Sequence, residues 1–521
     1  MSIVSNPRIS IALLAAQLAQ TIKGRRDLIC GQLIGSAGSA VAGTLYTDVA
    51  KKTKSELDSL FGVNSNIRNC IDQFISSNGG YSTVDVKVIA APVGEANKCE
   101  IDFASGVTAT EDGEYTFKIA DDRQFSKTIS VKTGDTIADF LGNVYNAYFT
   151  DAGAPANFPF SPGGGGVAGT AITFSTTDTA KIGSDFQIEI EGNVAGIGEA
   201  AVTLTASTAS DPDVSDFFDN LQSSRFTGVV WPWGWNSQAS VLTDYLDDRF
   251  NASNAILDGV GFMGYSDTFA NVKAFVDSKN SQSLCVGGYS KSVIHPADWA
   301  MSNFAGIRAR RLTVDAPIAN YITTTSGVLD AFGGPALASL PYFNSPMNQM
   351  SVVDPNVLYS SIEQSELEEA GFSVLGVNSA ENQMITGPMV TTYTTDIAGN
   401  PNDSFHYLNY VDTSSICREY FFNNLKARFS QSRLTNGSLV PGRSIENEES
   451  VRAEFSKIYK ELSLLSLTVA GAEAEKFFKQ YLNVTLDLAS RKVTATFQLP
   501  IVTQLGNMIV TAQLNFNFQE A

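Results

Sequence analysis

Side chains able to act as general bases or metal ligands are scarce in this chain. It has two histidines in 521 residues, His295 before a proline and His406 between two aromatic residues. A general base or a metal shell needs several such groups brought within bonding distance of one another. Neither histidine belongs to a pattern of that kind, so we interpret both as residues without a catalytic role. The sequence therefore predicts a protein that is not an enzyme and that binds no metal or cofactor.

Glycine patterns that hold phosphate groups give no better signal. No GxxxxGK[ST] loop occurs, and the one GxGxxG pattern, at Gly164, Gly166 and Gly169, follows a glycine-rich stretch and opens no helix. Phosphate binding requires that such glycines connect a strand to a helix N-terminus. We expect Asn157 to Val167 to be a flexible loop.

The thiols also lack a reactive arrangement. No CxxC pair occurs, and the cysteines are far apart in the sequence: Cys30, Cys70, Cys99, Cys285 and Cys417. This spacing fits neither a disulfide framework nor a zinc site, so we predict reduced thiols in the core.

The most unusual peptide is Trp231-Pro-Trp-Gly-Trp235. Three indoles this close could stack on a sugar or a base. The peptide directly follows an apolar run and has no basic cluster beside it, which favours a packing or subunit-contact loop. A secreted or surface carbohydrate-binding protein that uses this loop stays open as the alternative function.

Charge restricts the partners of the chain. Its formal net charge is −19, from 54 acidic and 35 basic residues, so its field repels nucleic acid and anionic lipid. The densest basic patch, Arg308-Ala-Arg-Arg311, is expected to pair with a neighbouring acidic surface. The apolar run Ile9 to Ala16 is far below the ~20 residues that span a bilayer, so no membrane insertion is expected. We favour a terminal arm there over a weak signal peptide.

Two sequence blocks predict one α/β domain. In the first, Leu28 to Leu33 reads as a buried strand, and Ser65 can cap a helix that Asn78-Gly-Gly80 ends. In the second, strands and helices alternate, which is typical of a mainly parallel sheet between helices. The predicted elements of this block are strand 226–231, helix 237–250, strand 258–263, helix 268–279 and strand 283–287. We assign residues 21–80 and 208–370 to this middle domain.

Residues 81–207 differ in composition and predict an inserted β-rich domain that faces outward. Short alternating segments rich in threonine dominate, as in Glu114 to Ala120 and Thr170 to Ser175. One helix is predicted there, beginning after Gly134-Asp-Thr136.

Residues 371–505 predict an α+β C-terminal domain. Its expected elements are strand 389–395, helices 415–429 and 445–465, and strand 492–499. In the second helix Val451, Phe455, Ile458 and Leu462 share one face and should be buried.

The two ends of the chain predict arms. Residues 506–521 form a regular amphipathic strand, because apolar residues alternate with polar ones: Met508, Val510, Ala512, Leu514, Phe516 and Phe518. Ordering an isolated arm costs ~1–2 kcal/mol of conformational free energy per residue, whereas each hydrogen bond contributes ~1 kcal/mol. The arm should therefore become ordered only when it pairs with the edge of an existing sheet. That edge belongs either to its own domain or to another subunit. In the N-terminal arm, residues 1–20, the apolar stretch is short and runs from Ile9 to Leu18.

The order and spacing of several segments resemble the contractile tail sheath proteins of Mu-like phages. The segments are Asp112–Ile119, Lys132–Ile137, Gly169–Phe174, Gly261–Ser266, Ser278–Ser281, Val390–Thr395, Tyr407–Val411, Arg428-Phe429, Leu499-Pro500 and Gln513–Phe516. The resemblance implies an α/β and α+β multidomain protein: a discontinuous sheath core domain with an inserted β-rich domain and extended terminal arms.

The same resemblance implies a function and partners. Copies of the chain would form stacked rings around a tail tube protein, between baseplate and tail terminator proteins, in a virion tail assembled in the host cytoplasm. Contraction would drive the tube through the host cell envelope. Both arms would lend strands to neighbouring subunits, through Ile3, Val4, Ile9 and Ile11 at one end and the alternating residues from Met508 to Phe518 at the other.

Overall fold

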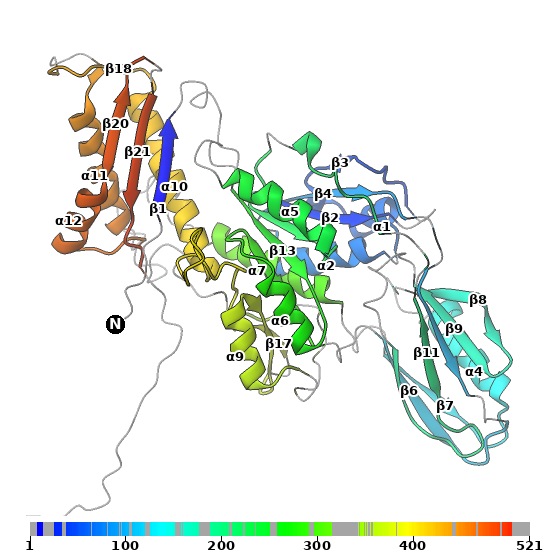
Figure 1. Ribbon diagram of the computed structural model, residues 1–521. Coiled ribbons are helices and arrows are strands. Elements are labelled where there is room, and N and C mark those ends of the chain that lie inside the picture. Colours follow the sequence, from blue (N-terminus) through cyan, green and yellow to red (C-terminus); the bar gives the residue numbers. More distant parts are fainter. Residues whose placement is uncertain are drawn as a thin grey trace, which may run out of the picture.

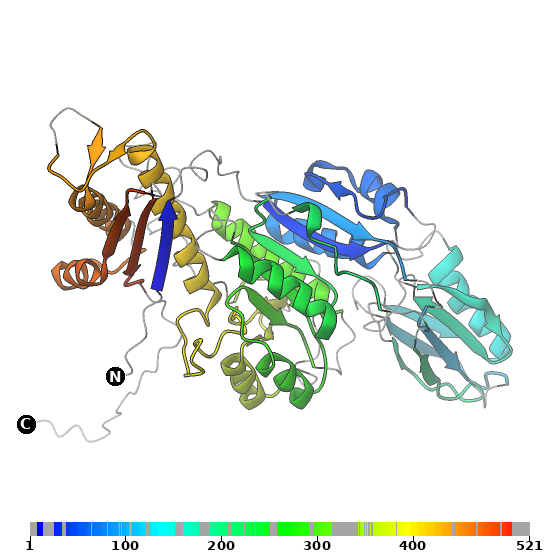
Figure 2. The same cartoon turned by 45° about the horizontal axis from the view of Figure 1, so that its top comes forward.

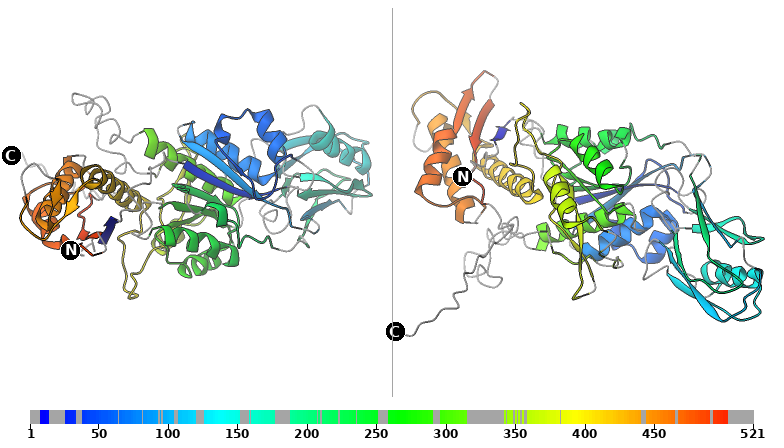
Figure 3. Two further views of the ribbon diagram at one scale, coloured as in Figure 1. Left: turned by 90° about the horizontal axis from the view of Figure 1, so that it is seen from above. Right: turned by 60° about the horizontal axis from the view of Figure 1, so that its bottom comes forward.

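The structure is a computed structural model, and its described residues are 8–13, 26–33, 38–63, 65–80, 82–92, 94, 96–103, 107–119, 126–151, 158, 160–176, 188–206, 208, 211–221, 224–234, 236–250, 258–290, 296–314, 342, 344–347, 350, 352, 355, 358–381, 383–439, 444–464, 467–489 and 492–502. Three units follow one another along an elongated molecule (Figures 1 and 2). A middle unit lies between a C-terminal unit and an inserted unit, and the views from above and below show the same row (Figure 3). The fold is mixed α/β with several sheets.

The middle unit contains a seven-stranded sheet in the order β15-β14-β13-β12-β2-β4-β3. Every neighbouring pair is parallel except β3 and β4, which are antiparallel. The strands are β2 (Arg26–Gln32), β3 (Leu45–Tyr46), β4 (Thr83–Ile89), β12 (Gly228–Trp231), β13 (Val260–Gly264), β14 (Leu284–Gly287) and β15 (Phe372–Ser373). The predicted parallel sheet, completed by the N-terminal block, is confirmed.

Helices cover both faces of this sheet because its strands alternate apolar side chains between the faces. Ile29 packs with residues of α2 (Asn66–Asn78) and α7 (Ala297–Val314). Leu28 and Cys30 pack on the opposite side. The helices of that side are α5 (Asn236–Arg249), α6 (Phe269–Asp277) and α9 (Ser361–Ala370).

Helix α2 begins and ends as its sequence predicts. The Ser65 hydroxyl accepts the Arg68 backbone N–H at 3.1 Å, and Gly79 ends the helix in the left-handed region with φ +63°. Its polar side is buried as well, against α7. There Trp299 Nε1 donates to Asn66 Oδ1 at 2.7 Å, and Asn303 Nδ2 donates to the Gln73 amide oxygen at 2.7 Å. A single apolar stripe in the sequence gives no sign of this second, polar contact.

The inserted unit is β-rich, and helix α4 (Ile137–Tyr145) begins at the predicted cap Thr136. Its two sheets have the orders β10-β6-β7 and β11-β5-β9-β8. The strands are β5 (Lys98–Asp102), β6 (Gly113–Ile119), β7 (Lys127–Val131), β8 (Phe160–Ala168), β9 (Ala171–Thr176), β10 (Ile188–Glu191) and β11 (Ala201–Thr205).

The prediction of a loop at 157–167 is wrong, because β8 lies within it. This strand pairs with β9, and its register shifts between Pro162 and Val167. A proline is tolerated because β8 is an edge strand and the shift relaxes the ladder. Buried Phe160, whose ring lies 6.1 Å from that of Phe174, anchors the strand.

Two expected boundaries are corrected by the strand pairing. Strand β4 joins β2 in the middle sheet, so the insert begins after Ile89 and not at residue 81. Strand β15 pairs with β14, so the boundary at residue 371 is also wrong. The hairpin of β16 (Leu375–Asn378) and β17 (Gln383–Thr386) follows, and Leu375 and Met384 belong to the core of the middle unit.

The predicted strand 389–395 is not a strand of any sheet. It forms isolated bridges, from Val390 to Tyr407 and from Thr395 to Pro401. Side chains take over part of its hydrogen bonding, because Thr391 Oγ1 donates to the Phe405 carbonyl at 2.7 Å and Thr392 Oγ1 accepts the Ser281 N–H at 3.1 Å. A threonine-rich sequence favours an extended backbone. In this segment the extended backbone forms no continuous ladder of hydrogen bonds with a neighbouring strand.

The tryptophan peptide packs inside the middle unit. Trp231 and Trp233 are fully buried, their rings 4.7 Å apart, and Phe217 lies against both. This confirms the packing interpretation for these two indoles, so neither is free to stack on a sugar. Trp235 lies outside the described residues. The prediction that the five cysteines are free core thiols is also confirmed.

The C-terminal unit places three helices on a small sheet. The helices are α10 (Leu408–Phe429), α11 (Glu448–Leu464) and α12 (Ala472–Tyr481). The sheet strands are β1 (Arg8–Leu13), β20 (Asn483–Asp487) and β21 (Lys492–Gln498), and a short parallel pair, β18 (Arg433–Leu434) and β19 (Ile445–Glu446), lies apart from them. The burial of Val451, Phe455, Ile458 and Leu462 on α11 is confirmed.

Candidate subunit interface and the charged joint behind it

The sheet of the C-terminal unit is built from both ends of the chain. Its order is β1-β21-β20 and both pairs are antiparallel, with Ile9 opposite Phe497 and Ile11 opposite Ala495. Figures 1 and 2 show β1, from the start of the chain, beside β21 from its end. A strand that starts the sequence therefore completes a sheet whose other strands lie more than 470 residues later.

One face of this sheet is apolar and the other is polar. Val484, Ala495 and Phe497 are buried toward the helices, and the Phe497 ring lies 4.9 Å from that of Phe421 on α10. On the opposite face Asn483, Thr485, Asp487 and Thr496 are exposed. Any strand added to this sheet must show the same alternation, apolar inward and polar outward.

The outer edge of β20 pairs with no strand among the described residues. The edge sequence Asn483-Val-Thr-Leu-Asp487 has no proline and no lysine, which are common protections of a free edge. Large apolar side chains flank it, since Tyr481 is 43% exposed and Leu488 is 42% exposed. In the described part of the chain, this edge is therefore available to another strand.

The predicted arm residues are placed in part. Ile9 and Ile11 lie in β1 and pair with β21 of the same chain. Ile3 and Val4, together with Met508, Val510, Ala512, Leu514, Phe516 and Phe518, lie outside the described residues. Exchange of either arm between subunits stays a prediction.

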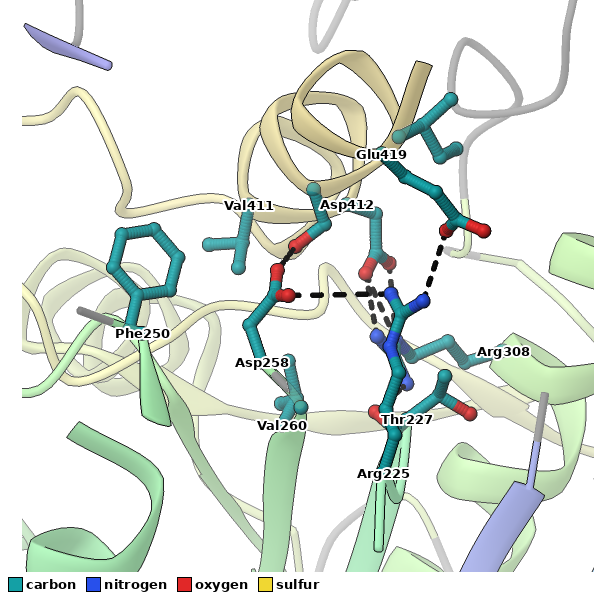
Figure 4. A pocket seen from close by; sticks show the side chains of 12 residues that line it. Arg225, Thr227, Phe250, Asp258, Val260, Arg308, Val411, Asp412 and Glu419 are labelled. Carbon is teal, nitrogen blue, oxygen red and sulfur yellow. Dashed lines mark hydrogen bonds and ion pairs between the residues drawn. The ribbon is translucent and has the colours of Figure 1, made fainter. Parts of the chain in front are cut away.

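Helix α10 joins this unit to the middle unit. Leu408 and Val411, in its first half, belong to the core of the middle unit, whereas Cys417, Phe421 and Leu425 belong to the C-terminal core. One continuous helix therefore supplies side chains to two cores. The polar residues of α10 near the boundary between these cores lie against the N-terminal ends of β12 and β13 (Figure 4). We call this group of charged side chains the charged joint.

The first contact of this charged joint is a close ion pair. Arg308 Nη2 donates to Asp412 Oδ1 at 2.5 Å, and Arg308 Nε donates to Asp412 Oδ2 at 3.0 Å. Arg308 Nη1 donates to the Thr227 carbonyl at 2.7 Å, and the Tyr342 hydroxyl donates to Asp412 Oδ2 at 2.7 Å. Burial would lower the pKa of Arg308, but Asp412 outweighs it and raises that pKa.

This geometry corrects the prediction for the basic patch. Arg308 is buried and pairs with a carboxylate of its own chain, so it is not free to meet the acidic surface of a neighbour. Arg310 is exposed, and the side chain of Arg311 lies outside the described residues.

The second part of the joint is looser. Asp258 lies 4.0 Å from Arg225 Nη2 and 3.8 Å from Arg418 Nη1, and the Ser415 hydroxyl donates to it. Arg225 Nη1 reaches Glu419 at 3.0 Å (Figure 4). Burial alone would raise the pKa of Asp258, yet the two arginines leave that pKa below its usual range.

The sequence carried one signal for this joint that the prediction missed. Asp412, Ser415 and Glu419 are spaced by three and then four residues, which places three polar side chains on one helix face. The predicted helix began at Ser415, so Asp412 was left outside it. The partners Arg225, Asp258 and Arg308 are distant in sequence and give no local pattern.

Among the residues that the structure describes, we recognise no catalytic grouping of the remaining titratable side chains. His406 is buried, its Nδ1 lies 3.2 Å from the Tyr393 carbonyl oxygen, and burial lowers its pKa. His295 lies outside the described residues. In the described part of the chain, no three or more His, Cys, Asp or Glu side chains are grouped to hold a metal ion. Every helix there is too short or too polar to span a bilayer.

Comparisons with known proteins give one structural likeness to report. No protein-family model matches the sequence, and no curated protein matches it. Among solved structures, the crystal structure of a sheath tail protein from Listeria innocua aligns over 94% of this chain and 95% of its own, at 11% identity and a TM-score of 0.45. A TM-score below 0.5 does not establish a shared fold.

Proposed function

We propose that this chain is a structural, non-enzymatic subunit of a contractile tail sheath, which polymerises around a tail tube and contracts to drive the tube through the host cell envelope. One observation carries the proposal: the C-terminal sheet contains a strand from the far end of the chain, and the outer edge of β20 pairs with no strand among the described residues. The resemblance of the sequence to contractile tail sheath proteins indicates the kind of assembly that we propose.

The C-terminal arm matches this edge in its pattern of alternating side chains. Its apolar residues, such as Leu514 and Phe516, recur every second position, as the buried Val484 and half-buried Leu486 do on β20. Residues Gln513 and Asn515 would then extend the exposed polar face. A strand of five or more residues added here gains ~1 kcal/mol per hydrogen bond and buries apolar side chains against Tyr481 and Leu488. We assign this arm to the sheet of another copy.

Strand β1 belongs to the same scheme. The register that places Ile9 opposite Phe497 can be filled by β1 of the same chain or of a neighbour. Twelve residues separate Leu13 from Arg26, a reach of roughly 40 Å when extended. That reach allows the strand to pass to an adjacent subunit in a ring.

The proposal includes partners and place. The chain would bind further copies of itself, a tail tube protein, and the baseplate and tail terminator proteins at the two ends of the sheath, but no nucleic acid. It would be assembled in the host cytoplasm and act in the virion, with the inserted unit facing outward. The middle and inserted units would pack against neighbours through ordinary surfaces, since a metastable lattice needs alternative packing and no catalysis.

The test changes one face of the arm at a time. Leu514→Asp with Phe516→Asp places charges on the apolar face, whereas the matched control, Gln513→Asp with Asn515→Asp, adds the same charges to the polar face. We expect the first variant to remain a soluble monomer that forms no tubes by negative-stain microscopy and sedimentation, and the control to polymerise. Normal tubes from the first variant, or from a chain lacking residues 508–521, would refute the arm assignment.

A further inference from the structure

The charged joint contains a tight contact and a loose one, and we propose that it is a two-position pivot. Helix α10 rocks about the Arg308–Asp412 pair, and Asp258 pairs alternately with Arg225 and with Arg418. The C-terminal unit, whose core contains the second half of α10, then has two orientations relative to the middle unit. This inference concerns the subunit alone and does not depend on the proposed polymer.

The fixed point of the pivot is fully bonded. The Arg308 and Asp412 side chains are at most 5% exposed and meet through two donating nitrogens, while Thr227 and Tyr342 take their remaining hydrogen bonds. Separating such a buried pair leaves uncompensated charge, at a cost of about 3–5 kcal/mol. This contact therefore stays closed while other contacts change.

The loose contact lies about one to two turns further along α10, at Ser415 and Arg418. Asp258 is held between two arginines at 4.0 Å and 3.8 Å, both too long for a hydrogen bond. Three buried atoms have no hydrogen-bond partner among the described residues, namely Arg225 Nε, Arg418 Nη1 and Asp258 Oδ1. A small displacement of Asp258 toward either arginine would close one of these two long contacts into a hydrogen bond.

The two arrangements differ in which unit supplies the arginine. Arg225 and Asp258 both belong to the middle unit, just before β12 and β13, whereas Arg418 lies on α10. Pairing of Asp258 with Arg418 draws α10 toward the start of β13, whereas pairing with Arg225 leaves α10 held at this point only through Ser415 and Glu419. Ser415 can donate to Asp258 in both.

Space for the motion exists beside these groups. A small cavity lies between α10 and the strand ends, lined by Arg225, Asp258, Val411, Ile416 and Glu419 among others (Figure 4). Closely packed interfaces resist small displacements, and an interface with a void and unbonded charges does not. The cavity borders both contacts, because Arg308 and Asp412 line it as well.

Distance measurement between spin labels tests the pivot. Asn271→Cys on α6 and Lys476→Cys on α12 place labels at exposed sites in the two units, and the five native thiols are buried. We expect two populated distances in the otherwise unchanged chain. Arg418→Met should leave only the distance that belongs to the Asp258–Arg225 pairing. Arg225→Met should leave only the distance that belongs to the Asp258–Arg418 pairing.

Matched variants keep the result interpretable. Glu446→Gln breaks the Arg428–Glu446 pair inside the C-terminal unit and should leave both distances populated. Glu419→Gln, at the exposed side of the joint, frees Arg225 and should shift the populations in the same direction as Arg418→Met. Because Glu419→Gln is the milder change, it replaces Arg418→Met in the distance measurement if the arginine variant does not fold. A single narrow distance that none of these variants moves overturns the proposal.

Discussion

The two principal sheets of this molecule differ in the length of their edge strands and in how their faces are covered. The seven-stranded sheet of the middle unit has helices on both faces and ends in two-residue strands, β3 and β15, that offer little backbone for pairing. The three-stranded sheet of the C-terminal unit has one bare polar face and ends in the five-residue β20. Among the described residues, the first sheet thus ends in short strands on both sides, whereas the second has a longer edge strand with no partner on its outer side.

Truncation of one core phenylalanine in each unit should sharpen this comparison most. Phe262 on β13 is fully buried in the middle unit, and Phe497 on β21 is buried in the C-terminal unit. Either change to alanine should lower the free energy of unfolding of its own unit by about 3–5 kcal/mol.

The natural fluorophores can tell the units apart. The four tryptophans all lie between residues 231 and 299, in the middle unit's part of the sequence. Denaturation followed by tryptophan fluorescence should therefore shift with Phe262→Ala and stay unchanged with Phe497→Ala, which moves only the circular dichroism transition. Equal shifts in both signals would mean that the two units unfold as one.

A second difference is the pH response of the middle unit. Burial raises the pKa of Asp298 to about 6, although Asn66 donates a hydrogen bond to its carboxylate. Between these two pKa values the folded protein holds a proton that the unfolded chain, with a pKa of ~3.9, has released. The contribution of Asp298 to the free energy of unfolding is therefore complete below pH ~3.9 and is lost as pH rises through about 6. We expect the middle unit to lose roughly 2–3 kcal/mol between about pH 4 and pH 7 from this group.

Asp298→Asn is the matched test because an amide keeps the shape and the hydrogen bond from Asn66 without the charge. The variant should flatten this part of the dependence of fluorescence-detected stability on pH. If the slope between pH 4 and 7 survives in the variant, another group causes it.

The smallest expected effect concerns helix caps. The Ser360 hydroxyl accepts the Glu363 backbone N–H at the start of α9, whereas α12 in the C-terminal unit begins at Gly471 with no side-chain cap. Ser360→Ala should cost about 1 kcal/mol in thermal unfolding of the middle unit, and Ser360→Thr should restore most of it. No loss in the alanine variant would show that this cap contributes little to α9.

Elements with a regular apolar period could be predicted from the sequence. Strands β2, β12, β13 and β14 follow from short continuous apolar runs, which are buried on both faces, and helices α2 and α11 follow from the spacing of their apolar residues. Strand β4 was assigned to the wrong unit because its Thr-Val-Asp-Val-Lys pattern resembles the insert. Its Asp85 and Lys87 are in fact buried, Asp85 paired with Arg26 and Lys87 donating to the Phe217 carbonyl.

The candidate site was predictable only where it is a local pattern. Period-two alternation predicts a C-terminal arm, whose residues lie outside the described part of the chain. The charged joint depends on four segments that meet only in three dimensions, through Arg225, Asp258, Arg308 and Asp412. A run such as Arg308-Ala-Arg-Arg311 reads as a surface patch because sequence does not show which arginine turns inward.

The sharing of α10 between two cores has a practical consequence for dissecting the protein. A fragment ending before Leu408 would lack Leu408 and Val411 from its interior, and a fragment starting after Phe429 would lack Phe421 and Leu425. Whichever piece keeps the helix would expose an apolar stripe to solvent. Recombinant fragments cut at either end of α10 should therefore precipitate.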